Sequence, residues 1–195
     1  VMNRNPEVTT AAPETEGLEV DNKLRQEASK TIAKLVSVQG EKNIELMEQG
    51  GTFTKAGDGM FLKSGDQVRV NGGTLGCFSI NPEILVYLNE QTQIAGGHRE
   101  LAAEDSCSIS LINGRLLAQI PSMADRSRFR IKAGSTLVYG PGSEILLTWE
   151  SGKALIASLR GTVYYTGTGG GESVLPAGKA VDISSGKQTD IDLEQ

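Results

Sequence analysis

The sequence predicts a mainly β protein: an antiparallel β-sandwich or jelly-roll-like fold of two related β-halves, with one N-terminal amphipathic helix. Three observations predict it. From Val36 onward, apolar residues recur in short runs with a period of two. Glycine-containing turns separate these runs, and the chain has 24 glycines in 195 residues, about twice the usual ~7%. No helical segment lies between the runs, which argues against repeated βαβ units.

Length and charge narrow the class of protein further. The 195 residues are enough for one large domain or two small ones. The net charge of -5 argues against nucleic acid or membrane lipid as the main partner, because phosphate binding needs clustered cations. No apolar run approaches the ~18 residues of a membrane span. Because the sequence begins at Val1, we expect that an upstream signal peptide or membrane anchor has been removed.

Residues 1–20 are expected to form an extended N-terminal arm, because they are polar and show no periodicity. This arm contains β-branched residues that suit an added strand. The candidate inter-subunit strand is Glu7, Val8, Thr9 and Thr10. It would pair with a sheet edge of its own domain or of a neighbouring copy, and simple packing within the chain is the alternative.

Residues 21–36 are expected to form the amphipathic helix, with Asp21 or Asn22 as its cap. Four apolar residues would share one face of it: Leu24, Ala28, Ile32 and Leu35. The β domain is expected to cover 37–187, with halves at about 37–100 and 101–187. Residues 188–195 form an acidic tail.

One short phrase occurs twice in the β domain, as "LKSGDQVRV" (62–70) and "LPAGKAVDI" (175–183). In each copy a leucine would end one strand, a glycine with positive φ would turn the chain, and a valine would begin the next strand facing the core. We therefore expect structural turns at Gly65, Asp66 and Gly178. The 113-residue separation (175 minus 62) fits two related halves.

The order of these motifs resembles the FecR domain family. The resemblance covers roughly residues 33–187 and rests on "VSVQGE" (36–41), "LKSGDQVRV", "LGCFSINPEILVYLNEQTQI" (75–94), "LINGRLLAQIP" (111–121) and "SLRGTVYYTG" (158–167). The chain departs from the family at Val70, where a threonine is usual, and at "GPGSEI". The resemblance implies an extracytoplasmic β-domain, in the periplasm, at the cell surface or secreted, that works through protein contacts. The family's founding role is to relay a signal from an outer-membrane transporter to a membrane-bound regulator.

We expect no enzyme activity, cofactor or metal. The single histidine, His98, lies in a turn-rich stretch, and no nucleophile motif accompanies it. One histidine and two distant cysteines do not make a zinc site. The glycines of "TGTGGGES" (166–173) precede a strand-like run rather than a helix, so they are expected to form a hairpin tip rather than a phosphate loop.

Cys77 and Cys107 permit one disulfide, and two buried thiols are the alternative. The run "RSRFRIK" would place four cations on one face of a strand: Arg126, Arg128, Arg130 and Lys132. This basic ridge would dock an acidic partner. The alternative is a solvated face that also protects an edge strand from aggregation.

Three functions fit these features. The first is a non-enzymatic, FecR-like protein-interaction module outside the cytoplasm, with a role in signal relay. The second is a structural subunit of a surface filament or assembly, in which the N-terminal arm adds a strand to the next copy. The third and weakest is a carbohydrate-binding β-domain, for which only Trp149 and four tyrosines are available as stacking residues. The expected partners are proteins, including copies of this chain.

Overall fold

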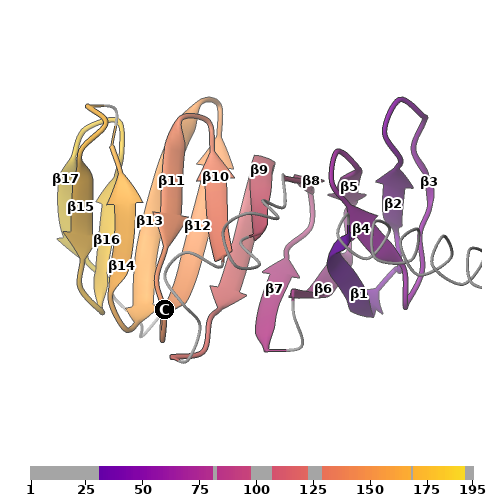
Figure 1. Cartoon of the computed structure of the whole chain (residues 1–195), viewed down its shortest axis with the longest axis horizontal. Coiled ribbons are helices and arrows are strands. Elements are labelled where there is room, and N and C mark those ends of the chain that lie inside the picture. Colours follow the sequence, from indigo (N-terminus) through magenta and orange to yellow (C-terminus); the bar gives the residue numbers. More distant parts are fainter. Residues whose placement is uncertain (1–30, 81–82, 98–106, 123–128, 168, 192–195) are drawn as a thin grey trace, which may run out of the picture. The chain divides into compact units, whose positions relative to one another are not determined.

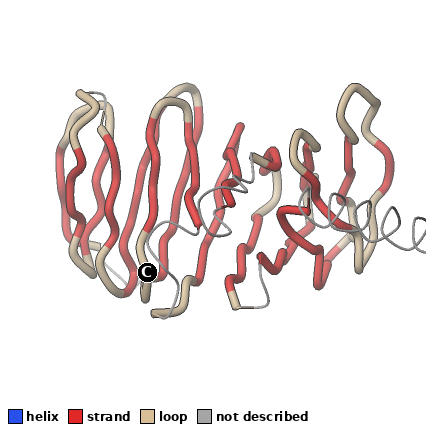
Figure 2. The backbone as a smooth tube through the Cα atoms, in the orientation of Figure 1, coloured by secondary structure: helices blue, strands red, loops and turns tan. Residues whose placement is uncertain are grey.

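The computed structural model describes residues 31–80, 83–97, 107–122, 129–167 and 169–191. Within these ranges the chain is mainly β and contains no helix (Figures 1 and 2). The strands are β1 (Thr31–Gly40), β2 (Ile44–Met47), β3 (Thr54–Lys55), β4 (Phe61–Lys63), β5 (Gln67–Val70), β6 (Thr74–Ile80), β7 (Ile84–Leu88), β8 (Thr92–Gly96), β9 (Cys107–Gln119), β10 (Phe129–Ala133), β11 (Thr136–Tyr139), β12 (Glu144–Glu150), β13 (Lys153–Arg160), β14 (Val163–Thr166), β15 (Glu172–Leu175), β16 (Lys179–Asp182) and β17 (Lys187–Asp190).

Backbone pairing arranges these strands in two series that share β9. Sheet A has the order β4-β1-β6-β7-β9-β12-β13-β16-β17. Sheet B has the order β3-β2-β5-β8-β9-β10-β11-β14-β15. All pairings are antiparallel except that of β9 with β10, which is parallel. The expectation of a purely antiparallel fold is therefore wrong at this one pairing, and the sheet is mixed.

Strand β9 joins the two series because its two ends pair in different sheets. Residues 107–113 pair with β8 and β10 in sheet B, whereas residues 114–119 pair with β7 and β12 in sheet A. The change occurs at Gly114, whose φ is +96°. A Cβ at this position would lie 2.6 Å from the Cα of Thr92, so only glycine fits here without displacing the neighbouring backbone.

The expected halves correspond to the two sides of β9. Strands β1 to β8 lie on one side of it in both sheets, and strands β10 to β17 lie on the other side (Figure 1). Side chains from both halves and both sheets meet in one hydrophobic core. Strand β7 is typical, because Ile84, Val86 and Leu88 are buried and the residues between them are half-buried. This two-series arrangement is compatible with the expected sandwich.

Both predicted glycine corners are present. Gly65 (φ +86°) lies between β4 of sheet A and β5 of sheet B, and Gly178 (φ +77°) lies between β15 of sheet B and β16 of sheet A. The repeated phrase therefore carries the chain from one sheet to the other, in opposite directions in its two copies. Four apolar residues of the phrase are fully or almost fully buried: Leu62, Val68, Leu175 and Val181.

A buried carboxylate gives the first corner additional stabilisation. The carboxylate of Asp66 is buried and accepts hydrogen bonds from the backbone N–H groups of Lys63 (3.0 Å) and Gln49 (3.2 Å). At the equivalent position of the second corner, Lys179 forms an exposed ion pair with Asp190 instead. The two corners share their glycine but differ in the side chain that stabilises them.

The expected helix at 21–36 is wrong for residues 31–36, which belong to β1. The helical spacing has a physical explanation. Bulges interrupt the pairing of β1 between Thr31 and Ala33 and between Leu35 and Ser37, and a bulge shifts the alternation of faces. Ile32, Ala33 and Leu35 are consequently all buried, which imitates a helical stripe. Residues 21–30 lie outside the described residues. No helix in the described ranges is long and apolar enough to span a bilayer.

Candidate functional site

The outer face of sheet A carries a row of apolar residues that crosses six strands. Each member lies directly opposite the next in the strand register, so their side chains share one face. The row consists of Cys77, Tyr87, Leu117, Leu146, Ala157 and Ala180. Their chain neighbours, such as Leu116 and Ala118 beside Leu117, point to the opposite face and fill the core.

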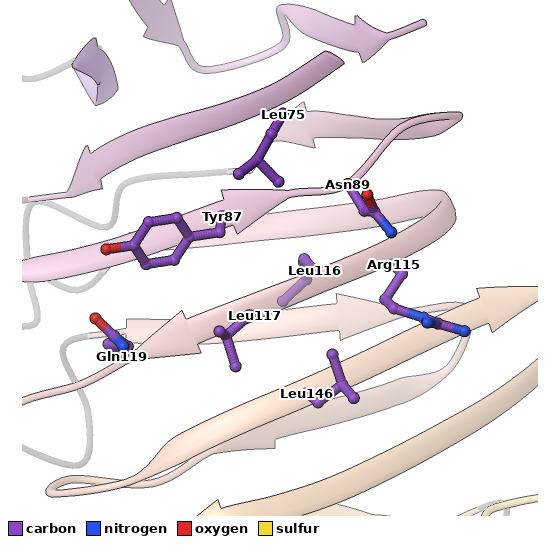
Figure 3. A pocket seen from close by; sticks show the side chains of 8 residues that line it. All are labelled: Leu75, Tyr87, Asn89, Arg115, Leu116, Leu117, Gln119 and Leu146. Carbon is purple, nitrogen blue, oxygen red and sulfur yellow. The ribbon is translucent and has the colours of Figure 1, made fainter. Parts of the chain in front are cut away.

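A shallow groove of about 300 Å³ lies over the middle of this row (Figure 3). Strands β6, β7, β9 and β12 supply its walls. Its apolar centre is formed by Leu75, Tyr87, Leu117 and Leu146, all half-buried side chains. The remaining lining residues are Asn89, Arg115, Leu116 and Gln119. The groove therefore offers apolar surface that a second molecule can cover.

The two ends of the groove are polar (Figure 3). At one end, Arg115 lies near Asn89, and its Nε donates a hydrogen bond to the hydroxyl of Thr148 (3.3 Å). At the other end, the amide of Gln119 donates to the carboxylate of Glu144 (3.2 Å). Arg115, Leu117 and Gln119 alternate along β9, so a cation, an apolar side chain and an amide follow one another on the same face.

Tyr87 is held in the groove by its neighbour in the row. The phenol of Tyr87 and the thiol of Cys77 are hydrogen-bonded to each other, and the thiol also bonds Ser37. Burial raises the pKa of Cys77, and burial together with the adjacent thiol raises the pKa of Tyr87. Both groups are therefore neutral at physiological pH, and this part of the groove stays apolar in character.

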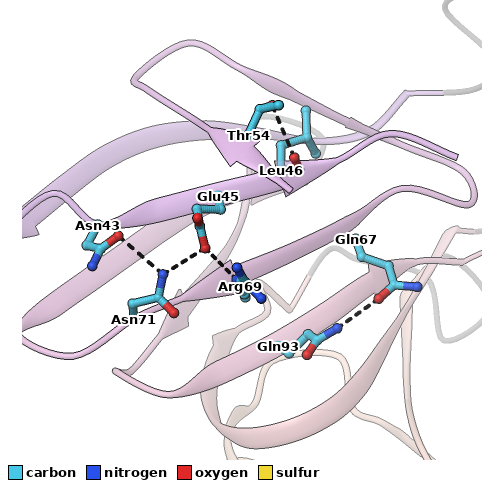
Figure 4. Close-up of polar contacts among 8 residues, drawn as sticks. All are labelled: Asn43, Glu45, Leu46, Thr54, Gln67, Arg69, Asn71 and Gln93. Carbon is cyan, nitrogen blue, oxygen red and sulfur yellow. Dashed lines mark hydrogen bonds and ion pairs between the residues drawn. The ribbon is translucent and has the colours of Figure 1, made fainter. Parts of the chain in front are cut away.

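On β2, β5 and β8, the outer face of sheet B differs because its polar side chains pair with one another (Figure 4). Arg69 forms an ion pair with Glu45 and lies 4.1 Å from the ring centroid of Phe53. The bond from Arg69, followed by the bond from Asn71, lowers the pKa of Glu45. Further side-chain bonds join Asn71 to Asn43 (3.2 Å) and Gln93 to Gln67 (2.8 Å). On these three strands the polar side chains therefore satisfy one another.

The structure contains no disulfide between Cys77 and Cys107. Both are buried thiols, one in sheet A and the other at the start of β9 in sheet B. Of the two alternatives, two buried thiols describe these residues, and the possible disulfide is absent.

The expected basic ridge is described only in part. Arg130 and Lys132 are exposed on β10, whereas Phe129 and Ile131 beside them are buried, which confirms the alternation. Arg126 and Arg128 lie outside the described residues. Strand β10 pairs with both β9 and β11, so it is an interior strand and the interpretation of an edge-protecting face is wrong.

Other candidate residues are either structural or outside the described part. Gly65, Asp66 and Gly178 form the two corners described above. The described ranges contain no cluster of His, Cys, Asp and Glu that could hold a metal ion. Trp149 packs against the core, and its ring is so close to Gly134 that a Cβ there would lie 2.5 Å from it. Residues Glu7 to Thr10 and His98 lie outside the described residues.

The groove was not predicted from the sequence, although a signal for it exists. A strand with one solvated face should alternate apolar and polar residues. The segments "LLA" (116–118) and "ILL" (145–147) are instead apolar at consecutive positions, so both of their faces present apolar side chains. Such continuous runs in β9 and β12 are the signal for an outer face that carries apolar side chains.

Comparison with known proteins gives a likeness of fold. No protein-family model and no curated protein matches the chain. Solved structures do match, among them two crystal structures of a "putative anti-sigma factor" from Parabacteroides distasonis, with 14% and 15% sequence identity and a TM-score of 0.51. Each match covers 65% of this chain and 59% of the solved chain, so it spans about three fifths of the neighbour's length. The chain therefore shares its fold with these proteins over about two thirds of its length, which is compatible with the FecR resemblance.

Proposed function

We propose that this chain is a non-enzymatic protein-interaction domain of the FecR-like type, a β-sandwich that works outside the cytoplasm and relays a signal across the cell envelope. The fold shared with anti-sigma-factor structures supports a role in signal relay in the broad sense. The sequence resemblance supports the extracytoplasmic location. The partner would be another protein of the envelope.

The observation that carries this proposal is the apolar row on the outer face of sheet A. Apolar side chains that are grouped on one face and bordered by polar residues are a common feature of interaction sites. Here Tyr87, Leu117 and Leu146 form the centre of such a group, with polar residues on either side. An apolar centre inside a polar rim is the usual anatomy of a protein interface. Covering each of these side chains contributes about 1–2 kcal/mol to binding.

Site-specific photo-crosslinking in cells of the source organism tests the proposal. A photoreactive amino acid replaces Leu117 in one variant and Arg130, on the outer face of sheet B, in the other. We expect a crosslink to an envelope protein from position 117 and none from position 130, and mass spectrometry identifies the crosslinked protein. A crosslink to a second copy of the chain would favour the structural assembly instead. Crosslinks from position 130 alone would refute sheet A as the docking face.

A further inference from the structure

We infer that the groove on sheet A selects a partner segment that carries an apolar side chain and a nearby carboxylate, and that Arg115 binds this carboxylate. The inference rests on the proposed function, because it specifies the chemistry of the partner at the same site. It follows from the position of one cation beside the apolar centre.

Arg115 lies two residues from Leu117 on the same face of β9, and its side chain is exposed. Among the described residues its hydrogen-bond partner is the neutral hydroxyl of Thr148, and no carboxylate pairs with it. One of its five N–H groups is used in this bond. The terminal nitrogens of the guanidinium therefore remain available for a carboxylate, which they can bind through two parallel hydrogen bonds.

A molecule that covers the apolar centre also removes water from Arg115. Strand residues two apart are separated by about 6.7 Å, so an occupant seated on Leu117 and Leu146 extends over the guanidinium. A purely apolar occupant would leave this charge desolvated and unpaired, which is costly. An occupant with a carboxylate at this position avoids the cost. The groove thus favours acidic partners and disfavours neutral ones.

The opposite end of the groove sets the orientation. Glu144 lies there with Gln119, about 13 Å from Arg115 along β9. Arg160 lies opposite Glu144 in the register of β12 and β13, so this end carries charges of both signs. Arg115 has no carboxylate opposite it among the described residues, so the acidic group of the partner belongs at the Arg115 end. The matching partner motif has its apolar and acidic side chains about 6–7 Å apart. That separation corresponds to positions i and i+2 of an extended segment or to positions i and i+4 of a helix.

The size of the groove favours a side chain of a protein as the occupant. Its volume of about 300 Å³ is at the lower limit of pockets that enclose a small ligand. It is therefore large enough for one or two side chains. Beyond it in the row, Ala157 is buried and Ala180 is half-buried, so the rest of a partner would meet small side chains there. The side-chain amides of Asn89 and Gln119 at its ends can bond the backbone of such a segment.

Peptide selection on the intact chain tests the inference. Random 12-residue peptides displayed on phage are selected on the wild-type protein and then tested against three variants: Leu117→Lys, Arg115→Glu and Lys132→Glu. We expect the peptides that bind wild type but not Leu117→Lys to carry Asp or Glu two or four residues from an apolar residue. These peptides should bind Arg115→Glu at least tenfold more weakly and Lys132→Glu as strongly as wild type. Selection on Arg115→Glu should yield Lys or Arg at the same spacing.

The outcomes separate the inference from the proposed function. Groove-dependent peptides without an acidic preference, or peptides that bind Arg115→Glu unchanged, would overturn the inference and leave the docking face intact. Peptides that all retain binding to Leu117→Lys would refute the docking face itself. The inference would also be overturned if palmitate bound wild type but not Leu117→Lys, or if a wild-type dimer in light scattering became a monomer in Leu117→Lys. All three substituted side chains are at least partly exposed, so we expect the variants to fold. Circular dichroism spectra and melting temperatures that match those of wild type establish this.

Discussion

Replacement of Gly114 by alanine is expected to lower the free energy of unfolding by about 3–5 kcal/mol. This glycine is the point at which β9 passes from sheet B to sheet A. Its φ of +96° is unfavourable for any residue with a Cβ. Such backbone conformations cost about 1–3 kcal/mol each.

Contact with β8 supplies the rest of the cost. The added Cβ would lie 2.6 Å from both the Cα and the Oγ1 of Thr92, whereas ordinary contacts begin at 3.4 Å, so Thr92 must move by about 0.8 Å (3.4 minus 2.6). The Thr92 hydroxyl donates to the carbonyl of Arg115 (2.9 Å) and accepts from its N–H (3.0 Å). Displacement of Thr92 weakens both hydrogen bonds, each of which contributes about 1 kcal/mol.

Gly152 provides a matched control for this experiment. It also has positive φ, +77°, but a Cβ at this position would have no atom within 4 Å. Gly152→Ala should therefore cost only the backbone conformation, about 1–2 kcal/mol. Equilibrium unfolding in urea, followed by circular dichroism and by the fluorescence of the single Trp149, measures both variants. If Gly114→Ala were within 1 kcal/mol of Gly152→Ala, the close approach of β9 to β8 would be refuted.

Three further predictions concern ionisable and sulfur groups. Folding lowers the pKa of Glu45, so its carboxylate stabilises the fold above the ordinary pKa of 4.5, and this stabilisation is lost as the pH falls. Urea titrations from about pH 5 to pH 3 should show a smaller loss of stability in Glu45→Gln than in wild type. Equal losses would contradict the ion pair. Asp66→Ala should lower the free energy of unfolding by about 2–4 kcal/mol, because it leaves two backbone N–H groups without their acceptor. Lys179→Ala at the second corner should lower it by less than about 1 kcal/mol. Similar losses in the two variants would argue against a stabilising role of the Asp66 carboxylate. Dithiothreitol should leave the melting temperature unchanged. Cys77 and Cys107 should react with a thiol reagent only after unfolding, since both are buried. A melting temperature lowered by the reductant would indicate a disulfide.

Local features of this fold follow from the sequence, because they depend on neighbouring residues. The alternation in β7 and the turns at Gly65 and Gly178 are set within a few positions of the chain, and the structure confirms them. The helix expected at 21–36 is wrong over residues 31–36 because of contacts with strands that are distant in the sequence. Bulges in β1, which are imposed by pairing with β4 and β6, bury residues at a spacing that imitates a helix.

Long-range features of the fold could not be predicted from the sequence, because the periodicity of apolar residues does not specify which strands pair. The parallel pairing of β9 with β10 and the passage of β9 between the sheets depend on contacts that no local pattern encodes. The candidate site has the same origin. Tyr87, Leu117 and Leu146 are each about 30 residues apart, and only the register of β7, β9 and β12 brings them into one row.

We propose that the outer face of sheet A, and not the basic ridge on sheet B, contacts the partner. The test is to measure the dissociation constant of the complex between the partner identified by crosslinking and each of two double variants. One variant combines Leu117→Lys with Leu146→Lys, and the other combines Arg130→Glu with Lys132→Glu. We predict that the first pair weakens binding at least tenfold, about 1.4 kcal/mol or more, and that the second pair changes it less than twofold. Weakened binding by the second pair with unchanged binding by the first would contradict the claim.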